Sequence, residues 1–336
     1  MTRTGRNSLC LAVALAIGGG LAAVSLAVPT EVRGPVTADV PADRLAPPAT
    51  APTNSPTIGG CRIYPADNAW NMRVDTLALR AGSAATIAKI QAVGGDNLHP
   101  DFGENPEYGI PFVVVAADQP LVPITYTEAG DESDPGPFPI PLDAPIEGGN
   151  GSSGDRHVIA LQQGTCQLYE LYSSYRSGGG WEAYSGAKFD LTSNVLRPLG
   201  WTSADAAGLP ILPGLVRYDE VAAGVINHAI RVTFSQTQSS YILPATHEAS
   251  SRTDVDLPPM GLRLRLRADF DISGLSGQAR VIAVALQQYG FIVADNGSNW
   301  FFQGAPSPGW DDDDLSQLKN IPGTAFEVVE TGPAQS

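Results

Sequence analysis

The stretch that most constrains the fold of this chain is a predicted β-hairpin in residues 154–172. Two segments rich in β-branched, aromatic and aliphatic residues flank a glycine-containing tetrapeptide at 162–165, a pattern typical of two antiparallel strands joined by a short loop. With that tetrapeptide as the loop, the expected facing pairs are Asp155 with Tyr172, His157 with Glu170, Ile159 with Leu168, and Leu161 with Cys166. Side chains alternate along a strand, so all of these lie on one face, which is polar at the end far from the loop.

Other segments also favour β-structure. Residues 227–234 alternate, and so do residues 261–272, where we expect the leucines to face inward and the arginines at 263, 265 and 267 to face outward. Charged residues are 16% of the chain, with 36 glycines and 28 prolines, which favours a turn-rich β protein. Helical spacing occurs at 83–93 and 276–289. We predict a mainly β fold, an antiparallel β-sandwich or jelly-roll-like sheet with two or three peripheral helices.

The N-terminus indicates export. Arg3 and Arg6 precede an apolar run that reaches Val28, with small residues placed for cleavage after Ala27. A retained membrane anchor is the alternative, because the run is nearly long enough to span a bilayer. We predict a signal peptide at 1–27, a Pro/Ala/Thr-rich linker at 28–58 and a single β-rich domain at 59–332, in a secreted, extracellular protein.

Removal of the signal peptide would leave two cysteines, Cys61 and Cys166. In an exported protein such a pair usually forms a disulfide bond. The alternative is two buried free thiols.

The formal net charge of −15 argues against nucleic acid and anionic membranes as partners, since both require a basic surface. A polysaccharide or oligosaccharide fits better, although acidic charge also keeps a secreted protein in solution. We expect a monomer that does not bind a membrane after signal removal.

Common catalytic motifs are missing from the sequence: it has no Gly-x-Ser-x-Gly, no His-Glu-x-x-His, no phosphate loop and no dinucleotide fingerprint. The four histidines, at 99, 157, 228 and 247, can form a metal site only if the fold gathers them. We therefore expect no metal and no cofactor. The four aspartates at 311–314 fit either calcium binding or the first turn of a helix, and we favour the helix.

Carboxyl groups are the best candidates for catalysis. Glycoside hydrolysis requires two of them, one acting as a general acid and the other as base or nucleophile. We predict that the catalytic residues are Asp155, His157, Glu170 and Asp295. For the hairpin residues the alternative is a cross-strand charge pair on a solvated face; for Asp295, which follows a buried strand, it is a tight turn.

Aromatic and histidine side chains in loops are candidates for substrate binding, because aromatic rings stack on sugars. The candidates are Tyr172, Trp181, Tyr184, His247 and Trp300, and at least some of the aromatic residues are expected in the core instead. The long irregular segment 130–154 leads into the polar end of the hairpin, so Glu132, Asp134 and Glu147 are expected to approach the same site.

Four segments carry a resemblance. They are Gly-Asp-Arg-His at 154–157, Thr-Cys-Gln-Leu-Tyr-Glu-Leu at 165–171, the stretch 196–214 with Gly-Trp-Thr-Ser-Ala-Asp-Ala-Ala-Gly-Leu-Pro-Ile-Leu-Pro-Gly, and Ala-Asp-Asn-Gly-Ser at 294–298. Together they resemble a set of exported bacterial β-rich proteins, over nearly the whole mature chain. No activity is known for that set, so the resemblance supplies no catalytic residues.

Two functional hypotheses follow. The first is an exported carbohydrate-active enzyme, a glycoside hydrolase acting through paired carboxylates. The second is a non-catalytic carbohydrate- or cell-wall-binding module. A polysaccharide lyase that uses His157 and Tyr172 is a further alternative, which the arginine stripe of 261–272 would suit.

Overall fold

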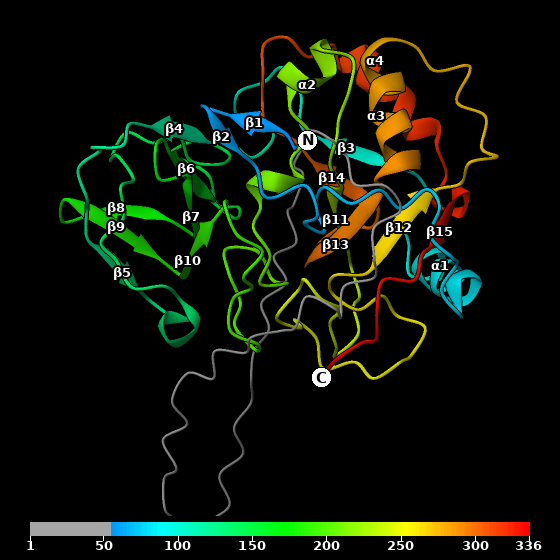
Figure 1. Cartoon of the computed structure of the whole chain (residues 1–336), viewed down its shortest axis with the longest axis horizontal. Helices are drawn as coiled ribbons and strands as arrows, with labels where there is room; N and C mark the ends of the chain where they lie inside the picture. The colour runs from blue at the N-terminus through cyan, green and yellow to red at the C-terminus, as the bar shows by residue number, and fades with distance from the viewer. Residues whose placement is uncertain (1–54) are drawn as a thin grey trace, which may run out of the picture. The chain divides into compact units, whose positions relative to one another are not determined.

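A computed structural model describes residues 55–336, and Figure 1 shows the arrangement of its helices and strands. The predicted signal peptide, and the predicted linker up to residue 54, lie outside the described residues. A two-stranded ladder begins the described fold, with β1 (Thr57–Ile58) paired to β2 (Cys61–Arg62). Backbone pairing continues to the other end, where Gln335 and Tyr241 exchange hydrogen bonds of 2.7 and 2.9 Å. The ordered structure therefore extends slightly past both boundaries predicted for the β-rich domain.

The fold is mainly β, as predicted. The six-stranded sheet has the order β15 (Phe326–Val328), β12 (Arg263–Leu266), β13 (Phe291–Asn296), β11 (Ile230–Phe234), β14 (Phe301–Gln303) and β3 (His99–Asp101). The four-stranded sheet has the order β10 (Ser185–Asp190), β7 (Gln167–Tyr172), β6 (Val158–Gln162) and β4 (Val113–Val115). The three-stranded sheet has the order β5 (Ile124–Tyr126), β9 (Gly180–Ala183) and β8 (Tyr175–Ser177).

Strand pairing is mixed, where the sequence predicted antiparallel sheets. β11 is parallel to β13, β14 to β3, β4 to β6, and β5 to β9. Parallel neighbours need a long crossover connection, and the chain provides one between β11 and β13 that contains β12 and the helix α3 (Gly277–Gln288). Alternation within each strand could be read from the sequence, whereas the direction of its neighbours could not.

Four α-helices lie in the described part of the chain: α1 (Ser83–Ala92), α2 (Tyr218–Ala222), α3 and α4 (Asp312–Ser316). The predictions at 83–93 and 276–289 match α1 and α3. Helix α3 buries the apolar face formed by Ala279, Ile282, Ala283, Ala285 and Leu286. It stops before Gly290, whose φ of 65° favours glycine. The aspartates of 311–314 begin α4, with the side chain of Asp311 accepting a hydrogen bond from the Asp314 amide, so the helical interpretation is confirmed.

The hairpin exists, but its predicted register is wrong. β6 pairs with β7 through Gln162 with Gln167 and Ile159 with Glu170, so the loop is 163–166 and each partner lies two residues further along than predicted. Cys166 has a positive φ of 52°. Cysteine rarely adopts this conformation, so the sequence does not predict it at this position. A two-residue shift keeps every side chain on its face, so the predicted shared face survives while the predicted pairs do not.

The predicted outward orientation of the arginines in 261–272 is also wrong for Arg263, which is buried. Its guanidinium donates to the carbonyl oxygens of Ala69, Met72 and Tyr289 at 2.8, 3.3 and 2.7 Å. Strand β12 is covered on both faces, so the alternation there separates two buried layers rather than core from solvent.

The predicted disulfide bond is confirmed: Cys61 and Cys166 are bonded, with their Cα atoms 5.4 Å apart and a sequence separation of 105. The bond ties β2 to the loop of the hairpin. None of the helices in residues 55–336 is both long and apolar enough to cross a membrane.

Candidate functional site

A polar cavity of about 220 Å³ lies where the ends of several strands meet. Its wall combines carboxyl, guanidinium, imidazole and amide groups with a smaller apolar part. The lining residues are Asp101, Ile110, Glu147, Asp155, His157, Arg231, Thr233, Asp295, Asn296, Gly297, Ser298, Phe301 and Gln303. Of the four residues predicted to be catalytic, the fold brings Asp155, His157 and Asp295 into this cavity.

The six-stranded sheet supplies one part of the wall through β11 and β13. These strands are parallel, so their carboxyl ends meet at the same edge and place Thr233 beside Asp295. The register shifts between Val232 and Thr233, which leaves Ala294 as an extra residue in β13. Such bulges change the direction of the side chains that follow, and Asp295 is the first residue after this one.

The hairpin side of the wall comes from the residues that precede β6. The amide of Ser173 donates to the Asp155 carbonyl oxygen at 2.8 Å, so the antiparallel pairing continues past the end of the strand. Arg156 has a positive φ of 56° and is anchored by hydrogen bonds to the carbonyl oxygens of Ser174, Asn150 and Ser152. This backbone turn leaves Asp155 exposed at the cavity and His157 buried behind it.

His157, which is buried, forms an ion pair with the partly exposed Glu147. The Nδ1 atom of His157 lies 2.6 Å from Oε2 of Glu147, and its Nε2 donates to the carbonyl oxygen of Ala204 at 3.0 Å. Both ring nitrogens face acceptors, which suits the imidazolium, the form with two donors. Burial lowers the pKa of His157, but the charge and hydrogen bond of Glu147 outweigh it and raise the pKa to about 9. Burial raises the pKa of Glu147, but the charge and hydrogen bonds of His157 lower it by more, so the net shift of this pKa is downward.

Arg231 is the second buried cation of the site. Its Nη2 and Nε bind the two carboxyl oxygens of Asp205 at 2.7 and 3.2 Å, and its Nη1 donates to Oε1 of Gln303 at 2.6 Å. The same Nη2 lies 3.8 Å from Oδ2 of Asp295. Two carboxyl groups therefore converge on one guanidinium.

The carboxyl groups of the cavity differ in their affinity for a proton. Burial and then the charge of Asp205 raise the pKa of Asp295 well above its ordinary value, against the opposing effect of Arg231. Burial also raises the pKa of Asp101. Asp295 is thus suited to hold a proton in the same cavity in which Glu147 is ionised.

Glu147, Asp155 and His157 each offer a ligand atom, and these atoms lie within 4.8 Å of one another. A metal, however, needs an imidazole nitrogen with a free lone pair. Both nitrogens of His157 are engaged with oxygen acceptors, so the trio does not fit a histidine-ligated metal and we derive no step through one.

Glu170, predicted to be catalytic, does not line the cavity. It is fully buried and accepts hydrogen bonds from the backbone amides of Ile211 and Leu212 at 2.8 to 3.0 Å. Burial raises its pKa to about 7 although those amide bonds oppose the shift. The predicted cross-strand pairing of His157 with Glu170 is absent because of the register shift, and the position of Glu170 is one that anchors the loop before β11.

The five residues predicted to bind substrate lie in three different environments: the core, the cavity surroundings and a region outside the cavity lining. Trp181 and Trp300 are core residues with exposed fractions of 1% and 0%, so neither can stack on a ligand. His247 lies outside the cavity lining, and its Nδ1 donates to the Ala206 carbonyl oxygen at 2.8 Å. Tyr172 lies beside the site, its ring centroid 5.4 Å from that of His157 and 5.5 Å from that of Tyr184, which is 42% exposed.

Of the acidic residues in the segment 130–154, Glu147 reaches the cavity. Glu132 instead accepts from the Thr202 amide, and Asp134 forms an ion pair with Arg197, so both fix the segment to the neighbouring chain. The predicted site residues did not include Asp101, Asp205, Arg231 and Gln303. A charged residue in an otherwise apolar strand, as with Arg231 in β11, is the signal that could have identified one of them.

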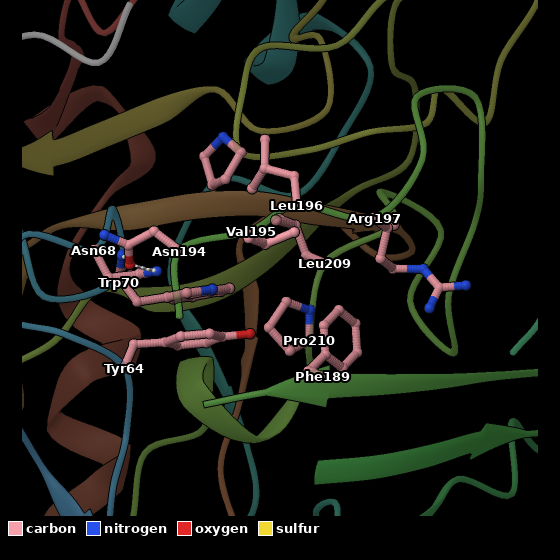
Figure 2. A pocket seen from close by; sticks show the side chains of 12 residues that line it. Tyr64, Asn68, Trp70, Phe189, Asn194, Val195, Leu196, Arg197, Leu209 and Pro210 are labelled. Carbon is pink, nitrogen blue, oxygen red and sulfur yellow. Dashed lines mark hydrogen bonds between the residues drawn. The ribbon is translucent and has the colours of Figure 1, made fainter. Parts of the chain in front are cut away.

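A second hollow lies near Tyr64 and Trp70, and its lining residues are drawn in Figure 2. The rings of Tyr64 and Trp70 lie one above the other there, with Pro210 and Phe189 beside them. Its volume is about 30 Å³, comparable to one water molecule in the liquid. A sugar ring does not fit, so the larger cavity is the candidate site.

Comparisons of the chain with protein-family models, with curated proteins and with solved structures give no match.

Proposed function

We propose that this protein is an exported glycoside hydrolase that acts on a polysaccharide or oligosaccharide. One observation carries the proposal: the same cavity contains one carboxyl group that favours its protonated form, Asp295, and another that favours its ionised form, Glu147. Glycosidic bond cleavage uses carboxyl groups in these two states.

In the proposed reaction Asp295 acts as the general acid and gives its proton to the oxygen of the leaving group. The Glu147 carboxylate faces the positive charge that develops on the sugar ring, or activates water, with Asp155 at the cavity beside it. His157 is a positioning residue, since its imidazolium holds Glu147 ionised through the 2.6 Å contact. Ile110 and Phe301 supply the apolar part of the wall, against which a sugar ring packs.

Two alternative functions receive less support. A lyase would need His157 as a neutral base or as part of a His/Tyr acid–base pair, but a pKa of about 9 and two engaged nitrogens keep that ring protonated near neutral pH. A binding module would need an exposed aromatic strip. Four of the five tryptophans, at 70, 181, 300 and 310, have exposed fractions of 3% or less.

Export is part of the proposal and rests on the N-terminal sequence pattern. The disulfide bond between Cys61 and Cys166 supports it, since such bonds persist mainly in oxidising compartments. The proposed partners stay as predicted, a neutral glycan chain and no nucleic acid.

The test is to screen the chain from residue 28 onward against a panel of soluble polysaccharides, measuring the release of reducing ends. We expect cleavage of at least one glycan by the wild type, and a loss on the order of 10²- to 10⁴-fold in Asp295→Asn. Asp118→Asn is the matched control, an exposed aspartate away from the cavity. Undiminished cleavage by folded Asp295→Asn would reject the assignment of the acid, and no cleavage of any glycan would reject the function.

A further inference from the structure

The structure assigns a positioning role to Asp205, a residue outside the cavity lining: Asp205 and Asp295 approach the same nitrogen of Arg231, and the charge of Asp205 keeps Asp295 protonated. The role in catalysis rests on the proposed function, whereas the pairing itself does not. The inference starts from the segment 203–205, which is buried and touches both cations of the site.

The segment has a fixed backbone. Ser203 Oγ accepts from the Asp205 amide at 2.9 Å and lies 2.6 Å from the Leu209 carbonyl oxygen, to which it donates. Ser185 Oγ donates to the Ser203 carbonyl oxygen at 2.7 Å. These contacts form a turn of the type that a serine side chain stabilises. The segment is therefore held in place independently of the cavity contents.

From this turn two consecutive residues reach the two cations. The Ala204 carbonyl oxygen accepts from Nε2 of His157, and the Asp205 carboxylate binds Arg231 through both oxygens. The bidentate contact fixes the plane of the guanidinium. The contact therefore also fixes the position of Nη2 of Arg231 relative to Asp295, which lies 3.8 Å from it.

The charge balance decides which carboxyl group holds the proton. Asp205 and Asp295 both lie within 4 Å of Nη2 of Arg231, at 2.7 and 3.8 Å. Two carboxylates that approach one cation this closely repel each other, which favours a proton on one of them. Asp205 is fully buried with both oxygens bound to Arg231, whereas Asp295 is partly exposed and makes the longer contact. The geometry therefore places the proton on Asp295, the member that faces the cavity.

Other charged and titratable groups surround the pair and are included in the test. The groups that face Asp295 are Asp205, Arg231, His157 and Tyr172, and the other acidic groups of the cavity are Asp101, Glu147 and Asp155. Replacing Asp205 by asparagine removes one negative charge near Asp295 and keeps a hydrogen-bond acceptor for Arg231.

The first measurement uses the wild-type chain from residue 28 onward and needs no glycan. Carboxyl carbons of aspartate are labelled with ¹³C and followed by NMR through a pH titration. We expect Asp205 and Asp295 to report the same pair of macroscopic midpoints, as coupled sites do. Independent, single midpoints for the two residues would overturn the inference, and so would a midpoint for Asp295 in the ordinary range of an aspartate.

The second measurement compares variants. In Asp205→Asn the midpoint of Asp295 is expected to fall by about one pH unit or more, in Asp205→Glu it stays closer to the wild type, and in the control Asp118→Asn it does not move. An unchanged Asp295 midpoint in folded Asp205→Asn overturns the inference; if that variant does not fold, the wild-type titration decides.

Activity separates the inference from the proposed function. If a glycan is cleaved, the alkaline limb of the kcat/KM profile of Asp205→Asn should move to lower pH together with the Asp295 midpoint. A merely structural role would lower activity at every pH without moving that limb. Coupled carboxyl groups in a chain that cleaves no glycan would reject the hydrolase and retain the pair, whereas cleavage with uncoupled groups would do the reverse.

Discussion

Two buried histidine–glutamate pairs in this molecule make nearly the same contacts. In one, Nδ1 of His157 faces Glu147 at 2.6 Å and Nε2 faces a backbone carbonyl oxygen at 3.0 Å. In the other, Nε2 of His228 faces Glu220 at 3.0 Å and Nδ1 faces the Ala229 carbonyl oxygen at 2.7 Å. Both rings are at most 2% exposed.

The surroundings of the two carboxylates differ. Glu220 is 9% exposed and also binds Arg217, so His228 and Arg217 together satisfy it inside the fold. Glu147 has a side chain that is 22% exposed and lines the cavity beside further carboxyl groups. A histidine–glutamate pair is thus not a site in itself. The open side of the carboxylate, and the acidic groups in excess of the cations, distinguish the pair at His157.

The largest expected effect is on catalysis. Glu147→Gln should reduce glycan cleavage by about 10²- to 10⁴-fold because it removes the ionised partner of the acid. Glu220→Gln, the same change in the other pair, should leave the activity per folded molecule unchanged. Initial rates normalised to the folded fraction, measured by near-UV circular dichroism, test this difference. Equal losses of glycan cleavage in the two variants would show that lining the cavity does not give Glu147 a catalytic role that Glu220 lacks.

The next effect is on stability. Here the substitution at Glu220 should cost more than the one at Glu147, the reverse of their expected effects on activity. Removing one partner of a buried ion pair costs about 3–5 kcal/mol because the remaining charges are left uncompensated. Glu220→Gln removes the short carboxylate contact of Arg217 and the acceptor of Nε2 of His228, and leaves Arg217 only the longer 3.5 Å contact to Asp219, so it should approach this range. Glu147→Gln leaves the His157 ring, which can release its proton so that no buried charge remains, whereas Arg217 stays charged, so Glu147→Gln should cost less. Guanidinium unfolding curves give both values, and a larger loss for Glu147→Gln would contradict this account.

The faces of the hairpin strands were predictable from the sequence, but not the partners across it. Alternation fixes which residues share a face, and a shift of two residues changes no face, so the predicted face of Asp155 and His157 is the one that meets the cavity. The loop at 163–166 has a positive φ at Cys166, for which the sequence carries no strong signal. Glu170 was consequently assigned to the site although it anchors a neighbouring loop.

The origin of the cavity was less predictable because both faces of the central strands are buried. Every residue of β11 is buried, so alternation could not tell the cavity side, with Arg231, from the core. The partner of Arg231, Asp205, comes from an irregular segment whose position depends on tertiary hydrogen bonds. Trp181 and Trp300 were expected in exposed loops since glycines and serines flank them, yet their rings fill the core.

The pH dependence of stability gives the smallest of these effects and the sharpest view of the cavity pair. The pKa of His157 in the folded protein, about 9, lies above the ordinary value of 6.5. The ring therefore binds its proton more tightly when folded. Its contribution is complete below pH 6.5 and is lost as pH rises through 9, and by linkage it amounts to roughly 3 kcal/mol.

Glu147 behaves in the opposite sense. Its pKa is lowered in the folded state, so its contribution is present above the ordinary value of 4.5 and is lost as pH falls through the folded-state pKa. Urea unfolding of the wild type should show a free energy of unfolding that declines between pH 6.5 and 9. In Glu147→Gln that decline should vanish, because burial, the largest effect on His157, then lowers its pKa against only the smaller effect of Asp155, and the ring stays neutral over the whole range. A decline of the same size in both proteins would mean that Glu147 is not the group that holds the proton on His157, and the difference between the two pairs would then lie outside their ion pairing.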